Sequence, residues 1–450
     1  MKVCMYVKNS FEYDARVTKE AASLAAAGHD VTVVAIHLPG VTARRETALS
    51  GVDVVRVTRL HDRIARLMPA STVAPGAGRP AGPRRRGGAG ARALRTMLWR
   101  AEPVLGWPLR ALNTLVLNAR FVRAGLDTRA EVFHAHDLNT LRIGAVSKAK
   151  SNGRLVYDSH ELHTHRNEMG VLRRTWASLL EHRGIRQSDA VIAATETWAD
   201  YLTGMYGVPR PTVVRNVPEL AEPEPGWDLR AHLGLASDVR VLLYQGSIQR
   251  NRGLEQIIDA LALLDRCALV VVGYGAYRPR LEQMVARRGL GAQVRFLGPV
   301  RHDELLNWTA GADVGMCCVR NSSLSYYSSL PNKVFEYMLA GIPVVASDFP
   351  EMGRVVRDER VGEVCDPDDP ASIAAAVRRI VDDPDHAARC REHAGAAIAR
   401  HHWGLEQRKL LELYAQLEAF PRLGSSATSN PAGRSLTRRL PSSTTNRSGR

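Results

Sequence analysis

The sequence lacks a long apolar run and lacks cysteine pairs at CxxC spacing. None of its apolar runs reaches the roughly 18 residues that span a bilayer, and residues 1–6 are typical of a strand, so we expect no signal peptide. The six cysteines are scattered, which favours reduced thiols in a cytosolic protein. With 450 residues, the chain is too long for one ordinary core, so we expect two or three domains.

Acidic residues are almost missing from two arginine-rich segments. Residues 63–110 contain ten arginines and only one acid, and residues 421–450 contain six arginines and none. These segments account for the whole net charge of +15, so the remainder of the chain is neutral. This distribution argues against a nucleic-acid partner and predicts two basic appendages on a neutral fold.

The insertion 60–110 and the tail 421–450 are expected to be wholly or partly disordered. Residues 74–92 are rich in Gly, Pro and Arg, and the tail is rich in Ser, Thr, Asn and Arg. The basic, Trp-bearing stretch 84–125 favours contact with an anionic membrane surface. The plain alternative is a disordered insertion between a strand and a helix.

Strand-like runs alternate with helical patterns along most of the chain, and the alternation restarts after residues 222–226. This order is typical of parallel sheets with crossover helices, so the predicted fold is α/β with two doubly wound domains. We expect one domain over 1–215, a second over 216–400, and a helix within 401–420 that crosses back to the first. The predicted strands lie at 2–7, 31–36, 53–57, 131–135, 154–158, 190–194, 240–245, 268–272, 293–297, 312–317, 342–346 and 361–364.

A polar loop follows the first predicted strand and leads into a helix near Asp14. Loops at the carboxyl ends of parallel strands border the ligand crevice of such folds, which makes Asp14 a candidate for a ligand contact. The alternative for Asp14 is a plain helix N-cap. No glycine-rich phosphate fingerprint occurs here, so we do not expect dinucleotide binding by this half.

Histidines cluster at the ends of two further predicted strands, in HAHDL and YDSHELH. Three interpretations stay open: hydrogen bonds to hydroxyls of a sugar or an acceptor, a zinc site, and strand-end packing with Asp137 as a helix cap. We prefer the first, because zinc would need a clear third ligand. The residues concerned are His134, His136, Asp158, His160 and His163.

The second half carries a loop that suits a phosphate. In YQGSIQRNRGLEQII, a strand ends at Gly246, a short loop carries Arg250 and Arg252, and a helix follows. Backbone amides at a helix start together with two guanidiniums form a phosphate site, although arginine pairs on loops are more often solvated. Gly273 and Gly275 end the next strand and allow a ligand to approach the backbone closely.

The stretch SSLPNKVFEYMLAGIPVVASD predicts a polar turn, a helix and a buried strand. Pro331 is expected at the first helical position, which puts Leu330 at the cap, where its side chain cannot accept a hydrogen bond. The first-turn amides are then free to bind an anion. The positive charge of Lys333 near the helix N-terminus is unfavourable for the helix dipole unless a negative ligand compensates it. The plain alternative is a surface ion pair between Lys333 and Glu336.

Seven stretches, in their order along the chain, resemble the retaining glycosyltransferases of family 4, in the branch with a PNKxFEYM motif. They are DARVTKEAASLAAAGHDVTVVA, HAHDL, YDSHELH, YQGSIQRNRGLEQII, VVVGYG, VRFLGPV and PNKVFEYMLAGIPVVASD. The match covers about residues 1–400 without 60–110. The resemblance implies the GT-B fold, in which two Rossmann-like domains face a central cleft.

The resemblance also implies roles for single residues. Glu336 matches a glutamate that holds the donor ribose, and His136 matches a histidine near the anomeric carbon. Ser328 stands where the family has an acid that contacts the donor sugar. The implied catalytic residues are His136, Arg252, Lys333 and Glu336.

The diphosphate-binding pair of the family falls on Ser247 and Arg252, with Arg250 and Lys333 as substitutes for the missing charge. The implied donor set comprises Gly246, Ser247, Arg250, Arg252, Gly273, Gly275, Leu297, Val300, Ser328, Ser329, Leu330, Asn332, Lys333 and Glu336. The implied acceptor-side set comprises Asn9, Asp14, His134, Asp158 and His160.

The resemblance implies a reaction that retains the anomeric configuration, needs no metal and uses no cofactor beyond the nucleotide-sugar co-substrate. Cationic side chains and helix-start amides would stabilise the departing diphosphate. We expect a saccharide or lipid-linked acceptor in polysaccharide, glycolipid or cell-envelope synthesis, in the cytoplasm at the inner face of the plasma membrane. The alternative is a catalytically silent nucleotide-sugar-binding or scaffolding protein, suggested by Ser247 and Ser328.

Overall fold

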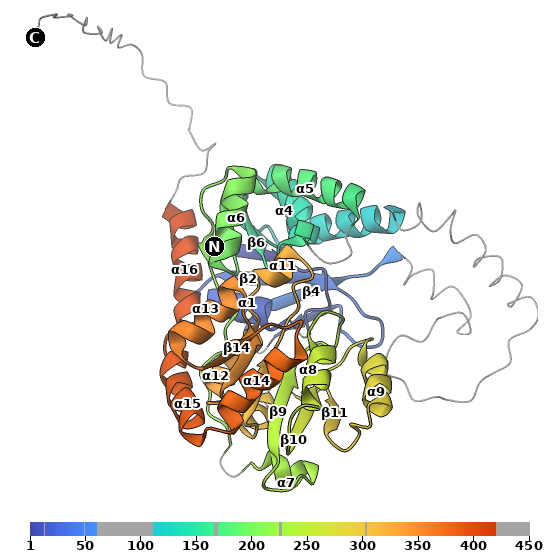
Figure 1. The fold of residues 1–450 in the computed structure, drawn as a ribbon. Helices are drawn as coiled ribbons and strands as arrows, with labels where there is room; N and C mark the ends of the chain where they lie inside the picture. The colour runs from blue at the N-terminus through green and yellow to red at the C-terminus, as the bar shows by residue number, and fades with distance from the viewer. Residues whose placement is uncertain are drawn as a thin grey trace, which may run out of the picture.

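Two parallel-sheet domains, stacked one above the other in Figure 1, make up the described part of the chain. This arrangement confirms the predicted α/β class with two doubly wound domains. The computed structural model describes residues 1–419 except 13, 49, 61–110, 166–169, 225–226 and 302–303. Within those residues, no helix is both long and apolar enough to cross a bilayer. The predicted disorder of 74–92 and 421–450 lies outside the described residues, as does most of the 84–125 stretch.

The first domain contains an eight-stranded sheet with the order β3-β4-β2-β1-β5-β6-β7-β8. Its strands pair in parallel except for the edge strand β3, and the central strands are apolar on both faces because helices cover both. The strands are β1 (Lys2–Tyr6), β2 (Asp30–Ile36), β3 (Arg45–Thr47), β4 (Asp53–Val57), β5 (Val132–His136), β6 (Arg154–Ser159), β7 (Ala190–Ala193) and β8 (Thr212–Val213). The helices are α1 (Ala15–Ala26), one over 111–127, α4 (Leu138–Ser151), the 3-10 turn η1 (His163–His165), α5 (Val171–Ile185) and α6 (Glu196–Tyr206).

The second domain contains a six-stranded parallel sheet with the order β11-β10-β9-β12-β13-β14. Its strands are β9 (Arg240–Gln245), β10 (Cys267–Val272), β11 (Val294–Gly298), β12 (Val314–Cys317), β13 (Val344–Ser347) and β14 (Gly362–Cys365). Its helices are α7 (Leu229–Leu233), α8 (Leu254–Leu261), α9 (Arg278–Arg287), α10 (Leu305–Ala310), α11 (Leu324–Tyr327), α12 (Asn332–Leu339), α13 (Pro350–Glu359), α14 (Pro370–Val381) and α15 (Pro384–Ile398).

All twelve predicted strands are present, and their ends differ from the predicted ends by at most two residues. The short strands β3 and β8 were missed, because three and two residues are too few to show a hydrophobic period.

The last described helix, α16 (Trp403–Ala419), lies beside the first domain although it follows the second (Figure 1). Trp403 and Tyr414 share an apolar core with Val17 of α1. The backbone amide of Trp403 donates to the carbonyl of Pro218 (2.8 Å). The two crossings between the domains therefore lie side by side.

The carboxyl ends of the two sheets face each other across the interface. The indole of Trp198, in the helix after β7, donates to the hydroxyl of Ser328, in the segment after β12 (2.8 Å). The amide and hydroxyl of Thr197 both donate to Glu351, in the helix after β13 (2.9 and 2.6 Å). Loops at the carboxyl ends are where ligands bind in open parallel sheets, so the site is sought between the domains.

Candidate active site

The helix that carries the PNK motif begins without a side-chain cap. α12 begins at Asn332, and Pro331 is its N-cap residue, with no side-chain hydrogen bond to the first turn. The prediction that Pro331 is the first helical residue and Leu330 the cap is wrong by one position. Proline likewise has no side-chain acceptor, so the first turn still offers its amides and the positive end of its dipole to an anion.

Lys333 is buried at this helix start and has no ion-pair partner among the described residues. Its side chain is 8% exposed, and its Nζ lies 3.6 Å from the centroid of the Tyr244 ring. Burial lowers the pKa of Lys333 to about 8, and Arg252 contributes in the same direction. The ammonium lies beside Gly246, where an added Cβ would be 3.7 Å from Nζ. A lysine held in this way has a charge that a bound anion would stabilise.

Glu336 does not pair with Lys333, so the alternative of a surface ion pair is wrong. Its carboxylate accepts a hydrogen bond from the amide of Gln245, whose oxygen accepts from the hydroxyl of Thr309 (2.8 Å). Gln245 is 2% exposed and ends β9. The chain of three side chains holds the Glu336 carboxylate in place. Sequence reasoning missed Gln245 and Thr309, although a polar residue at the end of the apolar run VLLYQ was a usable signal.

The charge of Arg252 acts on Lys333, whereas Arg250 is not among the groups that shift the pKa of Lys333. The Arg252 guanidinium carbon lies 4.7 Å from the Tyr326 ring centroid, and its Nε is buried without a hydrogen-bond partner among the described residues. Arg250 is exposed, and its charge acts on Tyr277 before α9. The structure therefore joins two of the three predicted diphosphate cations.

The predicted donor glycines are needed for loop packing. Gly246 and Gly273 have φ values of 117° and 144°, which side-chain-bearing residues rarely adopt. A Cβ on Gly273 would lie 1.9 Å from the carbonyl oxygen of Gly246, and one on Gly275 would lie 1.9 Å from that of Ile248. Close packing between the loops after β9 and β10 explains these glycines without a ligand. The loop after β9 lies beside Lys333.

The remaining predicted donor residues make hydrogen bonds and apolar contacts within the second domain. The Ser247 carbonyl accepts from the hydroxyl of Tyr244 (2.8 Å), and the Ser329 hydroxyl donates to the carbonyl of Tyr326 (2.8 Å). The half-buried side chains of Leu297, Val300 and Leu330 pack against the core of the second domain. Asn332 is the first residue of α12.

Ser328, predicted to contact the donor, lies in the contact between the two domains. Its side chain is fully buried, its hydroxyl donates to the carbonyl of Leu324 (2.6 Å), and it accepts from Trp198 of the first domain (2.8 Å). The hydroxyl thus serves the contact between the domains. Sequence reasoning could not find this role, because Trp198 lies 130 positions away.

In the first domain, Asp158 is the centre of a buried network. Its carboxylate accepts two hydrogen bonds from the Arg16 guanidinium (3.1 and 2.8 Å), one from His136 Nδ1 (3.2 Å) and one from His160 Nε2 (2.8 Å). Burial alone would raise the pKa of Asp158, but Arg16 and then His160 hold it well below its usual value. Asp158 is 0% exposed, and its hydrogen bonds orient the two histidines on the predicted acceptor side.

His136 and His160 are brought together, as the sequence predicted, and their protonation differs. Burial lowers the pKa of His136, which favours its neutral form, although the hydrogen bond to Asp158 acts in the opposite direction. Burial also opposes the charge of His160, but Asp158 and Asp137 outweigh it and raise the pKa of His160 to about 10. With Nδ1 donating to Asp158, the Nε2 of His136 is buried and has no partner among the described residues. Among the described residues, this ring nitrogen therefore has an unused capacity to accept a hydrogen bond.

His134, predicted on the acceptor side, is packed inside the first domain. It is 0% exposed, its ring stacks on that of His136 (4.2 Å between centroids), and its Nδ1 shares a hydrogen bond with the Tyr414 hydroxyl (2.9 Å). The predicted strand-end packing is therefore the correct interpretation for this residue. Tyr414 belongs to α16, so the last described helix holds His134 and, through the stacked rings, His136.

Four buried residues, Glu20, His134, His136 and Asp158, could hold a metal ion by their spacing, since one ligand atom of each lies within 4.8 Å of the others. Arg16 already provides a cation there, with nitrogens 2.9 Å from Glu20 and 2.8 Å from Asp158. Burial raises the pKa of Glu20 to about 8, and the charge of Asp158 adds to the effect. The group fits a buried arginine better than a divalent ion. Arg16 and Glu20 were missed, because buried charges have no pattern of their own in a helix.

Asp14 caps α1, because its side chain accepts from the amide of Val17 (3.2 Å). Its carboxylate also accepts from the side-chain amide of Asn9 (2.6 Å), and its charge acts on His136. Both residues therefore lie beside the histidines. Among the other predicted residues, His163 lies in η1, and Asp137 precedes α4 with a left-handed φ of 63° but without a side-chain cap bond.

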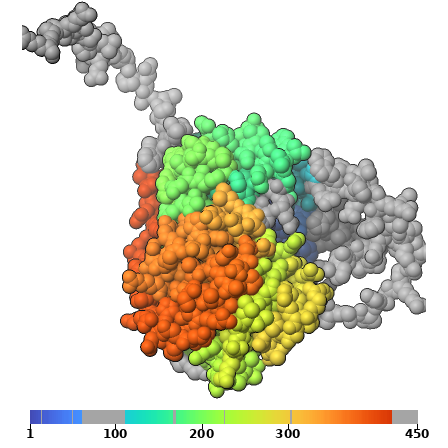
Figure 2. Space-filling view, viewed as in Figure 1, coloured from blue at the N-terminus to red at the C-terminus, as the bar shows by residue number. Residues whose placement is uncertain are grey.

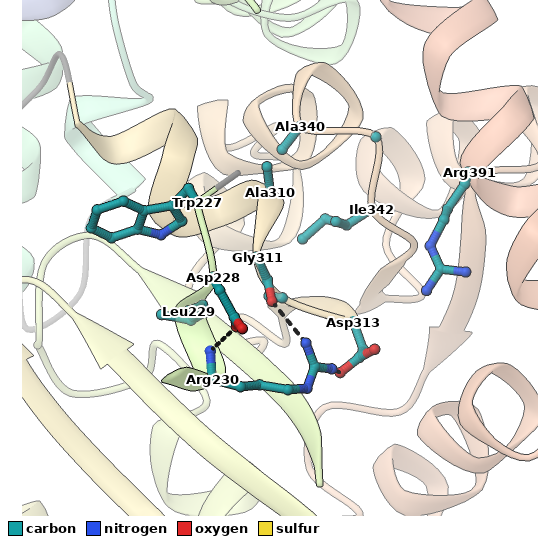
Figure 3. Close-up of a pocket in the computed structure, with 12 residues that line it drawn as sticks. Trp227, Asp228, Leu229, Arg230, Ala310, Gly311, Asp313, Ala340, Ile342 and Arg391 are labelled. Atoms are coloured by element: carbon teal, nitrogen blue, oxygen red, sulfur yellow. Dashed lines mark hydrogen bonds and ion pairs between the residues drawn. The ribbon is translucent and has the colours of Figure 1, made fainter. Parts of the chain in front are cut away.

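A separate hollow of about 380 Å³ opens on the far side of the second domain (Figure 3). In its wall, Asp313 directly precedes β12 and Ile342 lies two residues before β13, so the hollow is at the amino edge of the sheet. The Arg230 guanidinium in it pairs with Asp313. The hollow contains none of the predicted site residues.

Two family descriptions match most of the chain. "Glycosyl transferases group 1" matches residues 226–396, and "Glycosyl transferase 4-like domain" matches residues 13–217. The D-inositol 3-phosphate glycosyltransferase of Thermobispora bispora is 28% identical over 309 residues, which cover 64% of this chain and 71% of that protein. The glycogen synthase of Mycobacterium tuberculosis is 28% identical over 294 residues, which cover 61% and 68%.

Solved structures share the two-domain fold. Sucrose-phosphate synthase from Thermosynechococcus elongatus has a TM-score of 0.70 at 20% identity and covers 93% of this chain and 99% of its own. Anabaena HepE in complex with UDP-glucose has a TM-score of 0.68 at 18% identity and covers 92% and 100%.

Proposed function

Since the chain belongs to the glycosyl transferases group 1 family and is a glycosyltransferase with the GT-B fold, we propose that it moves a sugar from a nucleotide-diphosphate donor to a hydroxyl acceptor with retention of configuration. The second domain holds the donor and the first domain meets the acceptor. The observation that carries the proposal is the buried Lys333 ammonium at the uncapped start of α12, beside Arg252.

The donor diphosphate lies, in this proposal, between Lys333, Arg252 and the first-turn amides of α12. Two cations on aromatic rings and a helix start provide charge and hydrogen-bond donors, and among the described residues neither cation forms an ion pair with a carboxylate. Glu336 lies one turn further along the same helix, where its held carboxylate accepts from the ribose hydroxyls. The UDP-glucose complex of HepE supports a donor of this class.

The acceptor hydroxyl reaches the sugar from the first-domain side, close to His136. The free Nε2 of this neutral histidine hydrogen-bonds a sugar or acceptor hydroxyl while Asp158 fixes its tautomer. As the bond from the anomeric carbon to the diphosphate breaks, negative charge grows on the departing oxygen, and Lys333 and Arg252 stabilise it. The acceptor attacks from the same face, and its proton passes to the leaving phosphate.

A catalytically silent scaffold is the less favoured alternative. It rested on Ser247 and Ser328 at positions where the family has charged residues. Ser328 contacts the other domain, and Lys333 with Arg252 provides the diphosphate charge. These observations favour an active enzyme.

The proposed function is tested by thermal unfolding with a panel of nucleotide sugars and the matching nucleoside diphosphates. A bound donor raises the unfolding midpoint by mass action, and its diphosphate alone gives part of the shift. The variant Glu336→Ala is expected to lose the nucleotide shift and product formation, and Glu282→Ala, at an exposed glutamate of α9, serves as its control. Product formation that survives Glu336→Ala unchanged would contradict the assignment of the donor site.

A further inference from the structure

The helix α5 of the first domain has an apolar face that points away from the protein. Val171 and Leu172 are each 81% exposed, Trp176 is 65% exposed, and Leu179 and Leu180 are each 41% exposed. In Figure 1, α5 lies along the outer surface of the first domain, remote from the second. Contiguous apolar patches of this kind on a folded protein mark interaction sites.

The outward face is a continuous stripe rather than a scatter of single residues. Leu172, Trp176 and Leu179 follow each other at intervals of four and three, which places them on one side of a helix. The opposite side packs inward: Ile185 is buried, and Gly184 lies so close to Leu141 of α4 that a Cβ would be 2.5 Å from its side chain. The helix is therefore already anchored by one face, and the stripe is free for a partner.

The charge around the stripe is of one sign. Four arginines, Arg173, Arg174, Arg183 and Arg186, are exposed on or directly after α5. The single acid of the helix, Glu181, is 1% exposed and accepts hydrogen bonds from the hydroxyls of Tyr157 and Tyr206 (2.7 Å each). The exposed surface of α5 thus combines apolar side chains, a tryptophan and positive charge without a negative one.

We propose that α5 docks this face onto an anionic lipid bilayer, lying in the plane of the interface. A helix with Trp and Leu on one side and arginines at its edges buries its apolar side chains at the boundary between headgroups and acyl chains, while the arginines attract anionic headgroups. A second copy of the chain would instead bring two arginine-rich helices together, which their equal charges oppose.

The position of α5 relates the bilayer to the proposed acceptor side. The segment after β6 carries His160 of the histidine network, continues through η1 and leads to α5, which packs against η1. A bilayer at α5 therefore lies on the acceptor side of the molecule, away from Lys333 and Glu336 in the second domain. This geometry suits an acceptor that is presented at a membrane surface. The inference about the acceptor rests on the proposed function, whereas the inference that α5 docks onto a bilayer does not.

The test is co-sedimentation of the full chain with vesicles of phosphatidylcholine and phosphatidylglycerol, and with vesicles of phosphatidylcholine alone. The double variant Leu172→Glu/Trp176→Glu removes the stripe, and Leu263→Glu, at a 46% exposed leucine of the second domain, is the matched control. We expect the wild type and the control to bind the mixed vesicles, and the partition coefficient of the double variant to fall at least about tenfold. Binding of the wild type falls with salt and on neutral vesicles.

Three results would overturn the docking proposal. The first is that the double variant and the wild type bind vesicles equally. The second is that the wild type forms a dimer and the double variant is a monomer. The third is that deletion of residues 74–92 abolishes vesicle binding while the double variant still binds. The unfolding midpoint and the nucleotide-induced shift of the double variant are measured alongside. These report folding and donor binding, so a failed transferase assignment stays distinguishable from a failed membrane surface.

Discussion

The two sides of the proposed active site balance their charges in opposite ways. In the first domain, Arg16 lies between Glu20 and Asp158, and the charged His160 faces Asp158 and Asp137. In the second domain, Lys333 and Arg252 lie against the rings of Tyr244 and Tyr326, and neither pairs with a carboxylate in the part of the chain that the structure describes.

The difference shows which side is complete before a substrate arrives. A buried charge without a partner costs free energy unless something later compensates it. The network around Asp158 is neutralised by its own members, so it stabilises the fold and holds His136. The cations of the second domain have no ion-pair partner among the described residues, and burial, with the charge of Arg252, lowers the pKa of Lys333 although Glu336 acts in the opposite direction. That side is arranged for an anion from outside.

The largest expected effect comes from removing the cation of the first domain. Arg16→Met leaves the buried carboxylates of Glu20 and Asp158 without their guanidinium, which should lower the free energy of unfolding by about 3–5 kcal/mol. The affinity for a nucleoside diphosphate should not change, because Arg16 lies outside the donor site. Chemical denaturation and calorimetric titration measure the two quantities.

Arg16→Lys is the conservative partner of this variant, and it should recover part of the lost stability because it keeps the charge but not the paired hydrogen bonds. The contrast between the two domains would be contradicted if Arg16→Met is as stable as the wild type, or if it loses nucleotide affinity while its fold is intact.

The opposite pattern is expected for Lys333→Met. Loss of the ammonium that faces the leaving diphosphate should lower kcat/KM about 100- to 1000-fold, the range found when one donor to a developing charge is removed. The unfolding midpoint without ligand should stay the same or rise, because burial already disfavours the charged lysine. Steady-state kinetics and thermal unfolding measure both, with Lys150→Met at an exposed position of α4 as the control. Full activity in Lys333→Met would place the diphosphate elsewhere.

The smallest expected effect tests the contact between the domains. Ser328→Ala leaves the buried indole N–H of Trp198 without its acceptor, which should cost about 1–3 kcal/mol of stability. The KM for the donor should be unchanged. Trp198→Phe and the double variant complete a mutant cycle, and the coupling between the two sites should account for most of the loss. A raised donor KM with unchanged stability would restore Ser328 to the donor site.

The sequence predicted the order of elements, and it singled out several residues that the structure brings together, because these depend on local patterns. Apolar runs located the strands, and PNK beside a helix start located Lys333. Contacts between distant segments left no such pattern. Tyr414 supports His134 from 280 positions away, and Trp198 meets Ser328 from 130 positions away. Buried charges such as Arg16 and Glu20 look like ordinary surface residues of a helix until the fold encloses them.

The most direct test of the donor assignment is the number of protons taken up when a nucleoside diphosphate binds. The pKa of Lys333 is lowered to about 8 in the free protein, and a bound diphosphate should raise it, so above pH 8 binding should take up a fraction of a proton. Calorimetric titration with UDP, or with the diphosphate that the thermal panel selects, in buffers of different ionisation enthalpy measures this number. We predict uptake above pH 8 in the wild type and none in Lys333→Arg, whose guanidinium stays charged. Tight binding without proton uptake in the wild type, or with equal uptake in Lys333→Arg, would contradict the account.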